Sequence, residues 1–423
     1  MTVRPEETQL FGWEATLFQA AQAISLPESL YTTITERYST LEGILQAADD
    51  PVLRRAHVFP QGSIRLRTAI KPAPGAEGEL ATVDADAVVW LEHATDADHA
   101  HVLKAIAERF EEGRRVTAPI QPLRRGIRVV YSDENPGFHI DITPARNARF
   151  NTGKDGHGAL QVPDRKAGWK ASSPIAYCDW LDGISKMSLP VISMEAAMES
   201  IRKSVTAADA SQEDMPAYGE YTDSNVLRAA IKLLKRHRDM WAMRHAKKDY
   251  RPISAVLTTL AGLAYEQMSH QSSALNVRKP IDVLLELVEI MPHFIQGHPS
   301  NWTVCNPVDA GENFAEKWNR EDGHKYREAF DDWHRSAKAA FRLGLTEVGS
   351  VASLESFKEE MSKSFGTSKT LVERVLRDLP ADWSIPGLAP GVTRSSLALS
   401  ALSGSAVASR SPQSHVGPPD RLG

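Results

Sequence analysis

The stretches "VFPQGSIRLRTAIKP" (residues 58–72) and "VDADAVVWL" (residues 83–91) decide the fold. The first runs from apolar residues through a Gly-Ser pair into basic residues. The second alternates with a period of two, which predicts a strand with Asp84 and Asp86 on one face and apolar residues on the other. A glycine lets backbone amides approach a phosphate closely, and paired carboxylates suit a divalent metal ion. We therefore expect a phosphate-binding turn just ahead of a metal-binding strand.

A second alternating run, "GFHIDITPA" (residues 137–145), supplies a third acidic candidate. Asp141 falls on its polar face and joins the first pair if the two strands lie side by side. Carboxylates this close repel one another unless a cation lies between them, and magnesium binds through carboxylates and substrate phosphates. We expect Asp84, Asp86 and Asp141 to be catalytic residues that hold two Mg²⁺ (or Mn²⁺) ions for phosphoryl transfer. An exposed acidic pair at a strand end is the alternative for Asp84 and Asp86 taken alone.

Composition excludes several classes of protein. The 423 residues are 42% hydrophobic and 24% charged, with a formal net charge of −5. This acidic balance argues against binding of long nucleic acid such as DNA. No apolar run approaches the roughly 18–20 residues that a membrane span needs. Two cysteines cannot by themselves form a disulfide framework or a zinc site. We expect a cytoplasmic protein without membrane attachment.

The order of the patterns predicts an α+β protein with two domains and a tail. Helical periodicity covers residues 7–57, period-two runs dominate residues 58–145, and turn-forming residues make residues 146–195 look loop-rich. The periodicity is then helical again, and the chain ends in a stretch rich in Ser, Ala, Gly and Pro. The predicted units are an N-terminal unit of helices and core over 1–195, a helical lobe over 196–390 and a flexible tail over 391–423.

Six motifs together resemble the bacterial CD-NTases. These are the cGAS-like and oligoadenylate-synthase-like enzymes of CBASS antiphage defence, within the DNA polymerase beta-like nucleotidyltransferase superfamily. The motifs are "QGSIRLRT" (61–68), "VDADAVVWL" (83–91), "HIDITPA" (139–145), "LLKRHRD" (233–239), "ISAVLTTLAGLAY" (253–265) and "NPVDAGENFAEKW" (306–318). Each motif alone is weak, but their order is that of the family.

The resemblance implies a polymerase beta-like core, with a mixed or antiparallel sheet and helices, followed by a helical lobe. At matching positions, Gln61, Gly62 and Ser63 form the part that binds the nucleotide phosphates. A lysine on a basic helix face contacts the donor triphosphate in the family. Lys235 is the first candidate for this lysine and Lys232 the second, and a solvated basic face is the alternative for both.

Arg67 and the pair Ser172-Ser173 depart from the family pattern, and the role of His139 stays open. Arg67 stands where many relatives carry Gly, so the preferred base stays open. Ser172 and Ser173 stand where Asn is common, which leaves the contact of this segment with a base or ribose open as well. His139 either tunes Asp141 by hydrogen bonding or is a packing residue.

The function implied by the resemblance is that of a cyclic oligonucleotide synthase. Nucleoside triphosphates, ATP among them, are joined into a cyclic di- or trinucleotide that activates a CBASS effector. The alternatives are an RNA-terminal, tRNA-terminal or linear-oligonucleotide nucleotidyltransferase, and a non-catalytic nucleotide-binding scaffold. Some CBASS systems contain a ubiquitin-transfer-like partner, which makes the terminal Gly423 a candidate conjugation site, and a peptide-binding regulatory partner is another option.

Overall fold

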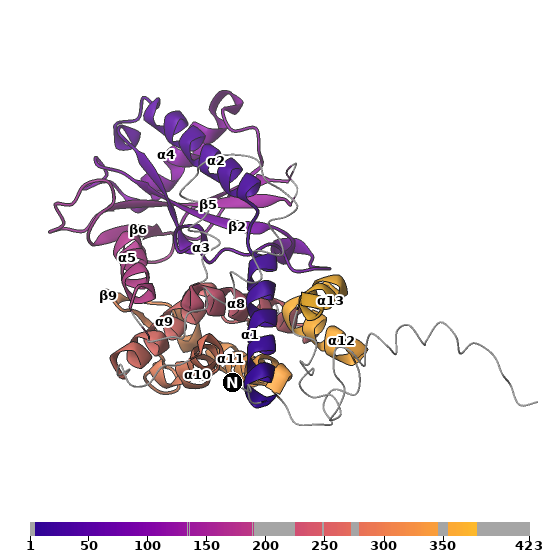
Figure 1. Ribbon diagram of the computed structural model, residues 1–423. Coiled ribbons are helices and arrows are strands. Elements are labelled where there is room, and N and C mark those ends of the chain that lie inside the picture. The colour runs from indigo at the N-terminus through magenta and orange to yellow at the C-terminus, as the bar shows by residue number, and fades with distance from the viewer. Residues whose placement is uncertain are drawn as a thin grey trace, which may run out of the picture.

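The structure is a computed structural model that describes residues 5–132, 134, 136–187, 189, 225–247, 249–271, 279–345 and 354–378. It has two parts, a sheet with helices and, beside it, a lobe made mainly of helices (Figure 1). The predicted tail over 391–423, with Gly423, lies outside the described residues.

A mixed sheet of seven strands forms the first part. Five of its strands follow the order β1-β2-β5-β4-β3, and a β6-β7 hairpin continues from the far end of β5. β2 and β5 are parallel, and the other pairs in the sheet are antiparallel. The strands are β1 (His57–Gln61), β2 (Val83–Trp90), β3 (Ile120–Pro122), β4 (Ile127–Tyr131), β5 (Phe138–Asn147), β6 (Leu160–Asp164) and β7 (Gly168–Ser172).

One face of this sheet is covered by helices, which leaves the other face for the site. α2 (Glu28–Gln46) and α4 (His99–Glu111) pack their apolar residues against it. From the strands, the same core receives small and branched residues such as Ala85 and Ile140, as the period-two pattern predicts. The acidic residues of β2 and β5 therefore project from the opposite face.

The helical lobe is built around a second apolar core. Its elements are α1 (Pro5–Ile24), α5 (Pro174–Ser185), α8 (Val226–Arg244), α9 (Ser254–Gln271), α10 (Pro280–Ile290), α11 (Gly323–Phe341), α12 (Leu354–Phe365), α13 (Lys369–Asp378) and a small hairpin of β8 (Cys305–Asn306) and β9 (Asp309–Asn313). Within the described part of the chain, none of the helices combines the length and apolarity that crossing a bilayer requires.

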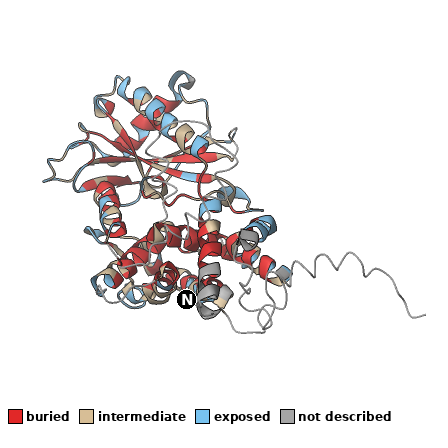
Figure 2. Ribbon diagram, in the orientation of Figure 1, coloured by how far each residue is buried: buried red, intermediate tan, exposed pale blue. Residues whose placement is uncertain are grey.

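Three features differ from what the sequence patterns predict. The predicted first unit includes α1, yet α1 packs in the lobe, where the Trp13 indole donates a hydrogen bond to Phe341 O (2.9 Å). Part of the region expected to be loop-rich forms the β6-β7 hairpin and α5. Pairing of the two strands satisfies the hydrogen-bonding groups of the backbone, even though the segment is rich in turn residues. α8 carries the predicted basic face with Lys232 and Lys235, yet it is buried along most of its length, since it lies between its own lobe and the sheet layer (Figures 1 and 2).

Candidate active site

The Gly-Ser turn lies directly beside the acidic strand. Gly62 begins the short helix α3 (Gly62–Arg65) with φ +58°, in the left-handed region that favours glycine. A Cβ at this position would lie 2.1 Å from Asp86 Oδ2. The Ser63 hydroxyl donates to the backbone oxygen of Asp84 (3.4 Å). The glycine is therefore required both by its backbone angle and by the approach of the carboxylate.

Parallel pairing of β2 with β5 brings the three predicted carboxylates together. The register places Asp86 opposite Asp141 and Asp84 opposite His139. Neighbouring strands lie about 4.8 Å apart, so side chains at paired positions on one face are neighbours. Asp84, His139 and Asp141 each offer a ligand atom, and these atoms lie within 4.8 Å of one another. The sequence could not show this pairing, because 55 residues separate Asp84 from His139.

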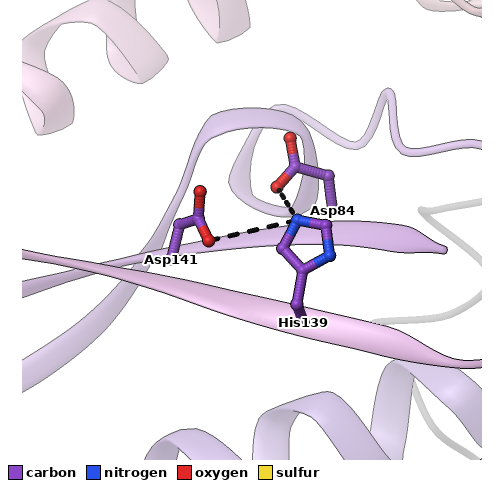
Figure 3. A group of neighbouring side chains, drawn as sticks. All are labelled: Asp84, His139 and Asp141. Carbon is purple, nitrogen blue, oxygen red and sulfur yellow. Dashed lines mark hydrogen bonds and ion pairs between the residues drawn. The ribbon is translucent and has the colours of Figure 1, made fainter. Parts of the chain in front are cut away.

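His139 lies between two carboxylates (Figure 3). Its Nε2 is 2.9 Å from Asp84 Oδ1 and 4.0 Å from Asp141 Oδ1, and its Nδ1 is hydrogen-bonded to the Thr82 hydroxyl (3.1 Å). The ring is buried, whereas 62% of the Asp84 side chain is exposed, towards the cleft that it lines. Of the two roles left open by the sequence, hydrogen bonding fits these contacts, but its partner at short distance is Asp84.

The electrostatics of the carboxylates favour a cation. Burial and the charges of Asp84 and Asp141 raise the pKa of Asp86 well above its usual value. The Asp84 carboxyl opens into the cleft but is still surrounded by protein, which opposes its charge; the hydrogen bond and charge of His139 outweigh this effect and lower the pKa of that carboxyl. Asp84 and Asp86 lie so close together that charging both is costly unless a positive group lies between them. Hard carboxylate oxygens of this kind suit Mg²⁺ or Mn²⁺, so the residues present fit the expected metal ions.

A cleft between the sheet layer and the helical lobe is lined by Asp84 and Asp86, whereas Asp141 lies behind its lining, paired with Arg128. Its empty volume is about 1360 Å³, space open to solvent included. Residues that line it include Gln61, Gly62, Ser63, Asp84 and Asp86 from the sheet layer and Lys235 from the lobe. The structure thus brings most of the predicted site residues to one surface.

The two candidate lysines of α8 have different surroundings. Lys235 lines the cleft and donates to Thr68 O (2.9 Å), in the segment that follows the Gly-Ser turn. Burial, with a smaller contribution from Arg238, lowers the pKa of Lys235 to about 8. Lys232 donates to the Ser25 hydroxyl (3.0 Å) at the end of α1. The structure brings Lys235 to the cleft with the carboxylates and uses Lys232 to join α8 to α1.

The residue that departs from the family pattern carries backbone strain. Arg67 has φ +58°, a left-handed angle that a residue with a Cβ adopts at a cost of about 1–2 kcal/mol. A glycine at this position would adopt the angle without that cost, so the arginine makes the turn less stable than a glycine would.

One arginine at the site was not predicted from the sequence. Arg128 on β4 lies opposite Asp141 in the antiparallel register, and its Nε and Nη2 donate to both carboxylate oxygens (2.6 and 2.8 Å). The hydrogen bonds and charge of Asp141 raise the pKa of Arg128, so the guanidinium stays charged. The alternation in "IRVVY" already placed Arg128 on the face opposite to its apolar neighbours, but only the pairing of β4 with β5 shows which carboxylate it meets.

Comparisons with known proteins point to one family. Residues 14–184 match the family model described as the Second Messenger Oligonucleotide or Dinucleotide Synthetase domain. The chain is CD-NTase-like. Over 248 residues it is 27% identical to the cyclic dinucleotide synthase CdnG of Bradyrhizobium diazoefficiens, an alignment that covers 56% of this chain and 55% of CdnG. The sequence match thus spans about half the length of that relative.

A solved structure extends the similarity in fold. The structure of the Bradyrhizobium diazoefficiens CD-NTase CdnG in complex with GTP matches with a TM-score of 0.65 and 20% identity. The match covers 87% of this CD-NTase-like chain and 98% of the CdnG chain. The predicted resemblance and the α+β nucleotidyltransferase fold are therefore confirmed, and the expected enzyme class is that of the matched family.

Proposed function

We propose that this protein joins nucleoside triphosphates into a cyclic di- or trinucleotide and releases pyrophosphate. The observation that carries the proposal is the meeting, in one cleft, of the Gly-Ser turn, the carboxylates of β2 and the Lys235 ammonium. The family of the matched domain and the name of the relative CdnG support the product class. The GTP bound in the CdnG structure supports a nucleoside triphosphate as the substrate.

Each part of the cleft has a role in this reaction. The turn at Gly62 and the Ser63 hydroxyl, which both line the cleft, bind phosphate oxygens, because backbone amides at a glycine can approach a phosphate closely. Lys235 adds a positive charge on the lobe side of the cleft. Asp84, Asp86 and Asp141 would hold two divalent ions, and His139 orients Asp84 by the hydrogen bond described above. Bound Mg²⁺ or Mn²⁺ neutralises phosphate charge and lowers the pKa of the attacking ribose hydroxyl.

The biological setting follows from the product class. A cyclic nucleotide of this kind is a second messenger, so we propose that the protein signals to an effector in CBASS antiphage defence. Nucleoside triphosphates are cytoplasmic, so that compartment stays the predicted one. Conjugation at Gly423 and a peptide-binding regulator also stay predictions.

A product assay tests the proposal. Purified protein is incubated with all four labelled nucleoside triphosphates and Mg²⁺ or Mn²⁺, treated with phosphatase and analysed by chromatography. We expect a phosphatase-resistant small product from the wild type, none from Asp84→Ala/Asp86→Ala, and an unchanged yield from Asp49→Asn, which alters an exposed carboxylate in the loop after α2. Label transferred to added RNA, or only linear products, would refute the proposal in favour of another nucleotidyltransferase reaction.

A further inference from the structure

The arginine on Asp141 occupies the carboxylate that a metal ion would need. Both oxygens of Asp141 accept hydrogen bonds from the Arg128 guanidinium, and the two side chains are only 16% and 18% exposed. Such a planar two-point pair is among the stronger polar contacts in proteins. A divalent cation that binds these oxygens meets a fixed positive charge within a few ångströms. Metal binding at Asp141 and this ion pair therefore oppose each other.

Arg128 has a second acidic partner, Glu79, in the same cleft. Its Nη1 lies 3.4 Å from Glu79 Oε1, and Glu79 Oε2 lies 3.6 Å from Arg251 Nη2 of the helical lobe. The Glu79 side chain is 66% exposed, which makes the contact weak and easily rearranged. Arg128, Glu79 and Arg251 all line the cleft. A guanidinium released from Asp141 thus stays in the cleft, where a nucleotide brings phosphate oxygens that match its geometry.

We propose that Arg128 guards Asp141: its guanidinium holds the third carboxylate until a divalent ion displaces it, and the released guanidinium then binds the phosphates of the nucleotide. Arg128 is in this sense a competitor of the metal ion at Asp141 and a binding residue for the nucleotide. The proposal rests on the proposed function only in its second half. The consequence is that metal and nucleotide bind cooperatively. Metal alone must compete with Arg128 for Asp141, whereas the phosphates of a nucleotide stabilise the released guanidinium.

The first test measures metal binding without nucleotide. Mn²⁺ is titrated into the purified full chain, and free Mn²⁺ is followed by electron paramagnetic resonance. We expect Arg128→Gln to bind Mn²⁺ about tenfold more tightly than the wild type, within the usual range of such couplings. Adding Asp141→Asn to Arg128→Gln should abolish the gain. The matched control is Arg124→Gln. Arg124 lies just before β4 and pairs with the buried Asp164 carboxylate instead of Asp141, so this variant should bind Mn²⁺ like the wild type.

The second test measures the opposite effect of the same variant. With Mn²⁺ saturating, Arg128→Gln should bind a non-hydrolysable nucleoside triphosphate about tenfold more weakly, because one charge-assisted phosphate contact is missing. Arg124→Gln should again behave as the wild type. A merely structural arginine would not change the two affinities in opposite directions. If Arg128→Gln fails to fold, Arg128→Lys, which keeps the charge but not the two-point pair, should show both changes at reduced size.

Two results would overturn the proposal. Unchanged or weaker Mn²⁺ binding by the folded Arg128 variants would show that the arginine supports the metal site instead of guarding it. Unchanged nucleotide affinity at saturating Mn²⁺ would remove the second half. Neither measurement depends on turnover, so failure of the synthase reaction and failure of this inference are separate outcomes.

Discussion

Substituting Gly62 by alanine tests whether the Gly-Ser turn must lie against the acidic strand. The new Cβ would lie 2.1 Å from Asp86 Oδ2, whereas ordinary contacts begin at 3.4 Å. Gly62 also has φ +58°, which costs a residue with a Cβ about 1–2 kcal/mol. Gly75 offers a matched control, because its φ is +71° but a Cβ there would have no atom within 4 Å.

The two variants should separate strain from displacement. Both are expected to lose about 1–2 kcal/mol of unfolding free energy from the left-handed backbone angle. Only Gly62→Ala also forces the Asp86 carboxylate or the turn to move by roughly 1 Å, a misplacement that can reduce the rate about 10²-fold. Gly75→Ala should keep its activity within about twofold of the wild type, since its only cost is the backbone strain and the new Cβ contacts no atom.

The assay compares initial rates of product formation with urea unfolding of the same preparations. Rates are measured at saturating nucleotide and metal, so that loss of affinity does not hide a loss of kcat. Equal rates for the Gly62 and Gly75 variants would refute the reasoning, because the contact with Asp86 would then have no catalytic consequence.

Two further predictions concern pH and charge. Burial raises the pKa of Glu14 from 4.5 to about 7. Between these pH values the folded state keeps a proton that the unfolded state has released. The unfolding free energy should therefore fall by about 3 kcal/mol as the pH rises from 4.5 to 7. Glu14→Gln can still accept the hydrogen bond of the Ile281 N–H. Urea unfolding at pH 5 and pH 8 should show no such fall in this variant, which should be more stable than the wild type at pH 8. An equal loss of stability between the two pH values in both proteins would contradict the assignment. Lys235→Gln should raise KM for the triphosphate about tenfold or more through loss of a charged contact, and wild-type affinity should fall as pH rises above about 8, where Lys235 loses its charge. Lys232→Gln tests the second lysine and should leave KM nearly unchanged, since Lys232 bonds to Ser25.

Local patterns in the sequence were sufficient for the parts of the site that lie on single elements. The alternation in β2 and β5 shows which residues share a face, because side chains on a strand alternate whatever the partner strand is. The Gly-Ser pair likewise marks a turn that needs a left-handed backbone, and Gly62 has one. The α+β class and the helical lobe follow from the change of period along the chain.

Long-range placement had to come from the tertiary structure. The contact between Arg128 and Asp141 depends on the register of β4 against β5, and a shift of one residue would turn Arg128 to the other face. The burial of α8 on both faces depends on its position between two layers. From the sequence, its lysines could be assigned to a basic helix face, but not to the cleft or to a contact with α1. α1 joins the lobe because its apolar residues pack against α8, far along the chain.

The sequence by itself thus determined which chemical groups are available and on which faces they lie, because propensity and periodicity act over a few residues. Only the tertiary structure decided which groups meet. It placed Asp141 beside Asp86 in the strand register, brought His139 within hydrogen-bonding distance of Asp84, and paired the Arg128 guanidinium with the Asp141 carboxylate. Those meetings are set by strand order, register and packing of distant segments, which no local pattern encodes.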